Sequence, residues 1–335
     1  MKIVLFIVLI SLTFGISEKN YQQKYTQIIY PYVQTFSSAN FKGVANKQVH
    51  YLSKDVGAHK GAIVIVPGKS EPALRYAEIA YDLKSQGYAI YIIDHRGMGQ
   101  SARLLSDGSD KVYVDRFTDY VSDLKTFMDT VVIPQKYKKV VFLGHSMGGA
   151  IIALYLEKYK QDVAGAILSA PMLQINTGKY PEKFAYTVTS FLSLIGLEKT
   201  YALGETKWKE KPFSERSLSS SSVRYWTSEV FIPQKHPETI SGGATNRWVK
   251  ESIAATWRAK RNSFKIATPI LLLQAGNDRL SVAAGQDAFL SKIKLSTKRV
   301  YASSRHGILM ETDIIRNQAL QDVIGFIRSL PVNRP

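Results

Sequence analysis

Cysteine is absent from this chain of 335 residues. The absence excludes disulfide bonds and a lipid anchor attached through an N-terminal cysteine. A domain of this size does not need disulfides, because 45% of the residues are hydrophobic and can form a large core. Internal repeats and long low-complexity tracts are also missing, apart from a short polar run at residues 217–222. The composition therefore indicates a globular protein rather than a repeat array.

Acidic residues are scarce relative to basic ones. The chain has 27 Asp and Glu against 44 Lys and Arg, which gives a formal net charge of +17. Nucleic acid is the obvious partner to consider, but the chain has no base-reading motif and no basic helix, so we expect no nucleic-acid binding. An anionic membrane surface accounts for the same charge, and a generally basic proteome is the alternative explanation.

Hydrophobic runs of membrane-spanning length are lacking as well. The longest run covers residues 3–16, between Lys2 and the polar residues that begin at Ser17. A positive start, a short apolar core and small residues near the end predict a secretory signal peptide over residues 1–17. Retention of the segment as an anchor is the alternative, although the run is short for a span. We expect an exported protein, periplasmic or secreted, with peripheral membrane association as a further option.

What the chain does contain is a Gly-x-Ser-x-Gly sequence between an apolar run and a helical pattern. Ser146 stands at its centre, flanked by Gly144 and Gly148. The glycines allow a sharp turn where side chains would clash, so the turn lifts Ser146 Oγ clear of the sheet edge. The same turn aims the Met147 N–H at the reacting centre. The motif predicts a nucleophile and one oxyanion-hole donor, with an ordinary glycine-rich turn as the alternative.

A serine nucleophile requires a base and a carboxylate that orients the base. Of the six histidines, His306 alone lies in a loop between a predicted strand and the final helix, where an open α/β sheet keeps its ligands. Asp278 ends the Gly-Asn-Asp turn after the apolar run 269–275, although Asp in such a turn can be purely structural. The chain order Ser, Asp, His is the order expected for this type of turn motif.

A second oxyanion donor is expected in the loop after an earlier central strand. The apolar run 61–66 leads into Pro67-Gly68-Lys69-Ser70. Gly68 lets the chain approach a substrate carbonyl closely, so the Lys69 backbone N–H is the predicted donor.

Strand and helix patterns alternate along most of the chain. Continuous apolar strands between amphipathic helices predict an α/β fold with a mostly parallel sheet covered on both faces. We assign the core to residues 18–171 and 267–335. Residues 172–266 interrupt the alternation and are expected to form an inserted helical lid.

The predicted lid has its own composition. It contains all four tryptophans of the chain and fifteen Lys and Arg against eight Glu and no Asp. Aromatic side chains interspersed with lysine suit an interface with lipid, so Trp208, Trp226 and Trp248 are the expected substrate or lid contacts. The alternative is that a small helical subdomain needs these bulky residues to hold itself together.

These motifs together resemble the α/β-hydrolase superfamily, and within it the bacterial lysophospholipase and monoacylglycerol lipase branch that is grouped with serine-aminopeptidase-like hydrolases. The resemblance covers about residues 45–330. Many lipases of this branch have His-Gly where this chain has Pro67-Gly68, which favours the lysophospholipases. The matching segments are 67–68 (PG) followed by Glu71, 76–78 (YAE), 94–101 (DHRGMGQS), 144–149 (GHSMGG), 169–172 (SAPM), 242–249 (GGATNRWV) and 276–278 (GND).

We therefore expect a serine hydrolase that cleaves carboxylic esters of single-chain lipids through an acyl-enzyme on Ser146. Monoacylglycerol lipase, short-chain carboxylesterase, serine aminopeptidase and a non-enzymatic membrane-surface binding protein are the alternatives. An aminopeptidase would need a carboxylate in the lid for the free amine of its substrate. No metal and no organic cofactor is implied, and no sequence feature indicates the oligomeric state.

Overall fold

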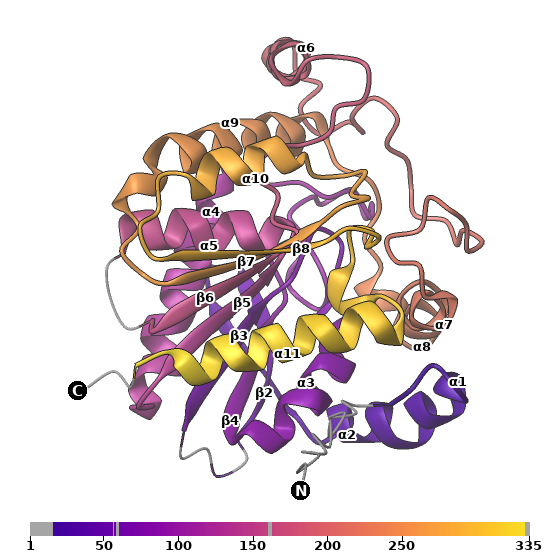
Figure 1. Cartoon of the computed structure of the whole chain (residues 1–335). Helices are drawn as coiled ribbons and strands as arrows, with labels where there is room; N and C mark the ends of the chain where they lie inside the picture. The colour runs from indigo at the N-terminus through magenta and orange to yellow at the C-terminus, as the bar shows by residue number, and fades with distance from the viewer. Residues whose placement is uncertain (1–15, 56, 58–59, 160–162, 332–335) are drawn as a thin grey trace, which may run out of the picture.

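A computed structural model describes residues 16–55, 57, 60–159 and 163–331 (Figure 1). Its centre is an eight-stranded sheet in the order β1-β2-β4-β3-β5-β6-β7-β8. The β1–β2 and β2–β4 pairs are antiparallel, and all other neighbouring pairs are parallel. The strands are β1 (Ser37–Lys42), β2 (Gln48–Lys54), β3 (Gly61–Val66), β4 (Tyr88–Ile93), β5 (Val140–His145), β6 (Gly165–Ser169), β7 (Ile270–Ala275) and β8 (Ser296–Tyr301).

The central strands are short, apolar and buried from end to end. Every residue of β3, β4, β5, β6 and β7 is buried. Alternate residues of β3 enter different clusters, with Val64 and Val66 in one and Ile63 and Ile65 in the other. Because side chains of a strand point alternately to its two faces, this division shows that the sheet carries a core on each face.

Helices cover both faces of the sheet (Figure 1). One face is covered by α4 (Phe117–Phe127), α5 (Met147–Lys158), α9 (Asn246–Asn262) and α10 (Ala283–Leu290). The other face is covered by α3 (Ala77–Leu83) and α11 (Asp313–Ser329), with α1 (Tyr21–Lys24) and α2 (Tyr30–Gln34) beside them. The predicted α/β architecture is confirmed by this three-layer arrangement.

The N-terminal part of the described chain contains helices and strands that the sequence did not predict. No element was predicted before residue 61, yet a helical segment formed by α1, the π-helical η1 (Tyr25–Ile29) and α2 precedes the β1–β2 hairpin. Tyr21, Tyr25, Ile29 and Val33 are buried at intervals of four residues. This spacing places them on one face of the helical segment, which packs against α3 and α7.

The stretch between β6 and β7 contains α6 (Glu182–Leu194), α7 (Ser222–Trp226), η7 (Thr227–Phe231), α8 (Ile232–Lys235) and α9. We call residues 172–245 the cap, because α9 differs from the rest. Helix α9 packs against α5, α4 and α10 and so belongs to the helical layer over the sheet. The lid predicted for residues 172–266 therefore includes one helix that is structurally part of the core.

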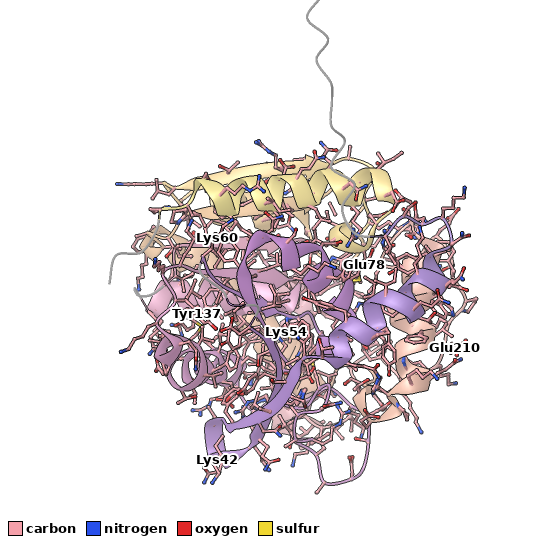
Figure 2. The ribbon with its side chains drawn as sticks, turned by 90° about the horizontal axis from the view of Figure 1, so that it is seen from below. Lys42, Lys54, Lys60, Glu78, Tyr137 and Glu210 are labelled. Atoms are coloured by element: carbon pink, nitrogen blue, oxygen red, sulfur yellow. The ribbon has the colours of Figure 1, made fainter. Side chains whose placement is uncertain are left out.

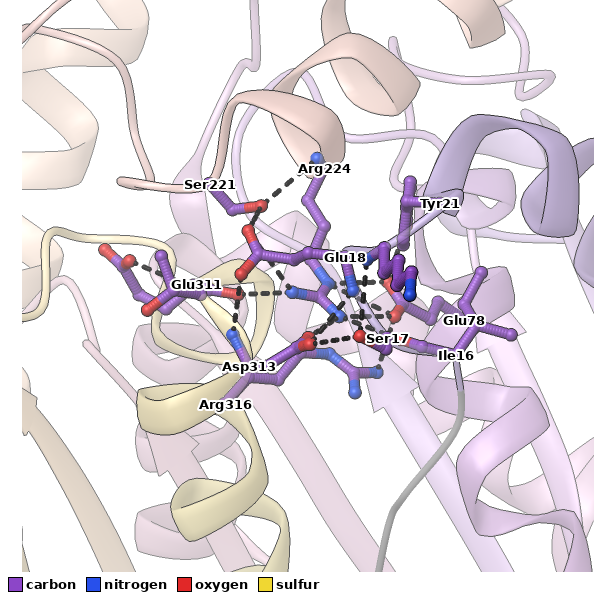
Figure 3. Close-up of polar contacts among 12 residues, drawn as sticks. Ile16, Ser17, Glu18, Tyr21, Glu78, Ser221, Arg224, Glu311, Asp313 and Arg316 are labelled. Atoms are coloured by element: carbon purple, nitrogen blue, oxygen red, sulfur yellow. Dashed lines mark hydrogen bonds and ion pairs between the residues drawn. The ribbon is translucent and has the colours of Figure 1, made fainter.

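A buried cluster joins the cap to the first described residues and to the start of α11 (Figure 3). Arg224 of α7 is 2% exposed and lies 2.8 Å from Asp313 of α11 and 3.1 Å from Glu78 of α3. Its guanidinium also donates to the Ile16 carbonyl at 3.2 Å. The Glu18 backbone N–H donates to Asp313 at 2.9 Å. Ion pairs thus fix the first described residues and the cap to the same point of the core. Residues 1–15 of the predicted signal peptide lie outside the described residues.

Candidate active site

Ser146 occupies a strained turn between β5 and α5. Its φ and ψ are 50° and −116°, a conformation that L-residues rarely adopt. The flanking glycines permit the packing around this turn. A Cβ on Gly148 would overlap the Val66 carbonyl oxygen, and one on Gly144 would lie 2.5 Å from the Ile152 Cδ1 atom. The turn therefore requires glycine at both positions, as a nucleophile elbow does.

His306 and Asp278 meet at the same sheet edge as Ser146. His306 Nδ1 lies 2.8 Å from Asp278 Oδ2, and both side chains are 4% exposed. The other carboxylate oxygen accepts the backbone N–H groups of Leu280 and Ser281 at 2.8 and 3.0 Å. Burial raises the pKa of Asp278, but His306 and the two backbone donors outweigh it, so the net pKa is lowered. An ionised Asp278 holds the Nδ1 proton and leaves His306 Nε2 free to act as a base.

The hydroxyl of Ser146 makes no hydrogen bond to any residue in the described ranges, His306 included. Its backbone is nevertheless held from both sides, since Ser146 N–H donates to the Ser169 carbonyl at 3.0 Å and Met172 N–H donates to the Ser146 carbonyl at 2.9 Å. Catalytic hydrogen bonds are often long without substrate and tighten in the complex. The three predicted residues thus stand at the ends of strands β5, β7 and β8 on one edge.

The oxyanion donors are predicted to be the backbone N–H groups of Met147 and Lys69. Met147 is the first residue of α5, so its N–H has no partner within the helix. Lys69 lies in the loop that follows β3. Gly68 N–H in the same loop donates to Glu71 Oε2 at 2.7 Å, and Ser70 N–H approaches Met98 Sδ at 3.2 Å. These contacts fix the loop on both sides of Lys69.

Glu71 is a site residue that sequence reasoning did not assign. It is 3% exposed and lies 3.6 Å from His145 Nε2 and 3.5 Å from Arg75 Nε, and it accepts the Tyr76 hydroxyl at 2.6 Å. Burial raises the pKa of Glu71, but His145 and Arg75 outweigh this effect and lower it to about 2. A charged Glu71 therefore holds the oxyanion loop through Gly68 N–H.

Two further contacts connect Glu71 to the rest of the site. Burial lowers the pKa of His145 to about 4, so this ring is neutral near pH 7. The His145 ring lies 4.8 Å from the ring of His306 and so stands between Glu71 and the Asp278–His306 pair. Arg75 reaches Glu229 of the cap at 3.2 Å. In the sequence, Glu71 after Pro67-Gly68 matches the family resemblance, but nothing near it in the chain indicates which residues it contacts.

A cavity of about 320 Å³ adjoins the oxyanion loop beneath the cap. Lys69, Ser70 and Arg75 form its core side, and Trp208 with residues 239–243 forms part of its cap side. Leu218 and Leu280 line both this cavity and a smaller one that reaches His306. The two cavities therefore share part of their walls, and the smaller one is lined by His306.

The three predicted tryptophan contacts occupy different environments. Trp208 lines the cavity, as a substrate contact would. Trp226 packs against Phe231, with ring centroids 5.1 Å apart. Trp248, in the first turn of α9, is 5% exposed, and Lys69 Nζ lies 5.6 Å from its ring. Trp248 stays a predicted contact, but it belongs to α9, the helix that packs on the core, and lies outside the cap.

Within the described residues, no group of three or more His, Asp or Glu side chains is arranged to hold a metal ion. None of the helices in these ranges combines the length and apolar character needed to cross a membrane.

The geometry can be compared with known proteins. The family model described as "Serine aminopeptidase, S33" matches residues 57–313. The chain belongs to this family of α/β-hydrolases. It is 34% identical to lysophospholipase L2 of Escherichia coli K12, over 86% of each chain. It is 29% identical to a monoacylglycerol lipase of Mycolicibacterium smegmatis, over 88% of this chain and 98% of the lipase.

Solved structures agree with the family's fold. A carboxyl esterase of Bacillus coagulans superposes with a TM-score of 0.71 at 18% identity, over 88% of this chain and 98% of the esterase. At that identity the likeness concerns the fold. The chain is thus an α/β-hydrolase, and Ser146, Asp278 and His306 are its predicted catalytic residues.

Proposed function

We propose that this protein hydrolyses carboxylic esters of single-chain lipids, lysophospholipids in particular. The observation that carries the proposal is the buried Asp278–His306 pair, 2.8 Å apart, at the sheet edge where Ser146 stands on its strained turn. A base that is oriented by a buried carboxylate beside a nucleophilic serine is the arrangement used in acyl transfer.

The reaction follows from the roles of these groups. Ser146 Oγ attacks the ester carbonyl while His306 Nε2 takes its proton, and the resulting oxyanion accepts hydrogen bonds from the Met147 and Lys69 N–H groups. Collapse breaks the bond to the alcohol, which leaves with the proton from His306. Water then attacks the acyl-enzyme as His306 takes its proton. Collapse breaks the bond between the acyl carbon and Ser146 Oγ, which takes the proton back from His306, and the fatty acid is released.

The residues that line the cavity favour a lipid ester as the substrate rather than the N-terminus of a peptide. An aminopeptidase needs a free carboxylate for the substrate's amine, and Glu205 and Glu229 are the acidic residues that line the cavity. Each faces a cation, since Lys69 Nζ lies 3.7 Å from Glu205 and Arg75 lies 3.2 Å from Glu229. The similarity to relatives named lysophospholipase and monoacylglycerol lipase also supports lipid esters as the substrates.

The test is a side-by-side assay of the purified protein. We expect hydrolysis of lysophosphatidylcholine and of monoacylglycerol, with the lysophospholipid preferred, and slower hydrolysis of short p-nitrophenyl esters. Aminoacyl amides should be poor substrates. Ser146→Ala serves as the control for contaminating hydrolases. Preferential cleavage of the amides would replace the proposal by a peptidase, and no hydrolysis by the wild type would defeat it.

We also propose that the protein is exported with removal of residues 1–17. The support is the composition of the N-terminus, with Lys2, an apolar run and the small residues Gly15 and Ser17. Amino-terminal sequencing of protein recovered from the cell envelope or the medium tests this. A mature chain that begins at Glu18 is expected, and a chain that begins at Met1 would favour the retained anchor.

A further inference from the structure

The outer helix of the cap exposes apolar side chains that no other described part of the protein covers. Half of the fourteen large hydrophobic residues that are exposed in the described ranges lie between positions 180 and 203. Leu194 is 83% exposed and Phe191 59%. We call Phe184, Phe191, Leu194 and Ile195 the α6 face; α6 lies at the outer edge of the molecule (Figure 1).

The polarity of α6 is the reverse of that of an ordinary surface helix. Its inner side packs against α9, where Tyr186 lies 4.9 Å from the Trp257 ring and Glu182 accepts the Trp257 N–H at 2.8 Å. Phe184, Phe191 and Ile195 are spaced by seven and four residues and therefore fall on the opposite side. A surface helix normally presents polar residues to water, so the exposed apolar stripe indicates a contact with another apolar medium.

Lysines surround this stripe. Lys179 and Lys183 are exposed at the start of α6, and Lys199 is exposed beyond its end. The acidic residues of the same stretch are Glu182, which is directed inward to Trp257 and Lys260, and Glu198, which is half-buried. A lysine-flanked aromatic and aliphatic face matches the boundary of an anionic bilayer, where headgroups attract the cations and acyl chains receive the apolar groups.

We propose that the α6 face inserts into the surface of a bilayer that contains anionic lipid and holds the cap against it. This assignment rests on the proposed function, because the bilayer would then supply the substrate. The proposal also places the lipid contact on α6, whereas the sequence predicted it at the tryptophans. Trp208 and Trp226 are half-buried, at the cavity and against Phe231, whereas the exposed apolar groups belong to α6.

The apolar contribution is tested by sedimentation with vesicles of phosphatidylcholine alone and of phosphatidylcholine with 30% phosphatidylglycerol. The variant Phe191→Asp with Leu194→Asp removes the proposed insertion. Binding to the anionic vesicles should fall by about tenfold or more for each apolar side chain withdrawn. The matched control is Ile314→Asp, because Ile314 is 85% exposed on α11 and lies outside the α6 face. Its binding should equal that of the wild type.

The charge contribution is tested with Lys183→Glu and Lys199→Glu. Loss of each lysine should weaken anionic-vesicle binding by about fivefold at low salt, and added salt should weaken the wild type in the same direction. Lys42→Glu with Lys60→Glu is the control pair, since both residues lie on the side seen from below in Figure 2, whereas α6 lies at the top of Figure 1. If both pairs of substitutions weakened vesicle binding equally, the effect would come from net charge, and the α6 face would not be a specific membrane contact.

The outcomes separate this inference from the proposed function. Equal binding to neutral and anionic vesicles, or binding to neither, overturns the membrane face even if the lipid esters are hydrolysed in micelles. A dimer that Phe191→Asp with Leu194→Asp converts to monomer also overturns it, because a second copy then covers α6. Failure to hydrolyse any ester would defeat the proposed function. The vesicle assay would still show whether the α6 face binds a membrane. All the α6 variants should retain hydrolysis of a short soluble ester.

Discussion

Replacing Arg224 by methionine should be among the most damaging single changes outside the active site. Arg224 Nε lies 3.2 Å from both carboxylate oxygens of Glu78, and Nη1 donates to the Glu311 carbonyl at 2.8 Å. Its ion pair with Asp313 joins the cap to α11 (Figure 3). Methionine preserves much of the side-chain length but removes every donor, so Glu78 and Asp313 lose a buried counter-charge.

The magnitude follows from the burial of this cluster. Removing one partner of a buried ion pair typically lowers the free energy of unfolding by about 3–5 kcal/mol, because the remaining charge is left uncompensated. For a chain of this size, an unfolding entropy of about 2 cal/mol/K per residue converts that loss to a decrease in Tm of roughly 4–8 °C. Arg316, 3.3 Å from Glu78, retains part of the compensation and keeps the expected loss within this range.

The assay is denaturant unfolding combined with a double-mutant cycle. Arg224→Met, Glu78→Gln and the double variant are compared, and the double variant should be more stable than the sum of the single losses predicts, by about 1 kcal/mol or more. The control is Arg216→Met, an exposed cap arginine, which should change stability by less than about 0.5 kcal/mol. The Arg224–Glu78 ion pair would not stabilise the fold as expected if the losses of the two single variants were additive. The same conclusion would follow if Arg224→Met lowered the unfolding free energy no more than Arg216→Met.

Three further predictions concern the site. Ser146→Ala should lower kcat by about 10⁴ without unfolding the protein and should abolish fluorophosphonate labelling; a variant that is still labelled would place the nucleophile elsewhere. Glu71→Gln should lower kcat about tenfold to a hundredfold with little change in KM, because the anchor of Gly68 in the oxyanion loop weakens; an unchanged kcat would contradict that role. Burial lowers the pKa of His95 and of His145 from 6.5 to about 4, so the unfolded chain binds more protons on acidification. Their contribution to stability is complete above pH 6.5 and is lost as the pH falls toward 4, by up to about 1.4 kcal/mol per pH unit for each histidine. In His95→Asn, the unfolding free energy should depend less steeply on pH, because one of the two histidine contributions is gone. An unchanged pH dependence would argue against a buried neutral His95.

Much of the fold could be predicted because its elements carry local signals. The strands β3 and β4 begin and end where their apolar runs do, at residues 61–66 and 88–93. The N-terminal helices were missed although Tyr21, Tyr25 and Ile29 repeat at helical spacing. The polar residues between them and the mid-helix Pro31 hid a segment that is stable only because one face packs against the core.

The site divides in a similar way. Ser146, Asp278 and His306 could be predicted because each stands where a strand ends, and parallel strands bring their carboxyl ends to one edge. Glu71 and Arg75 could not, because their role depends on Gly68 N–H, His145 and the cap residue Glu229 approaching from separate segments. A buried carboxylate with four partners has the same sequence appearance as an exposed one.

From residue 61 onward, local signals predict most of the core strands and helices, their order and the residues at the strand ends, because turn chemistry and apolar periodicity act between neighbours in the chain. Which charges are buried together, and which apolar faces stay exposed, depends on the packing of segments that are distant in the sequence. Trp248 is buried by α9 packing on the core, and Leu194 is exposed because α6 contacts α9 through its opposite side. Burial is a property of the surroundings that distant segments supply, and so it is not encoded in the local pattern of either helix.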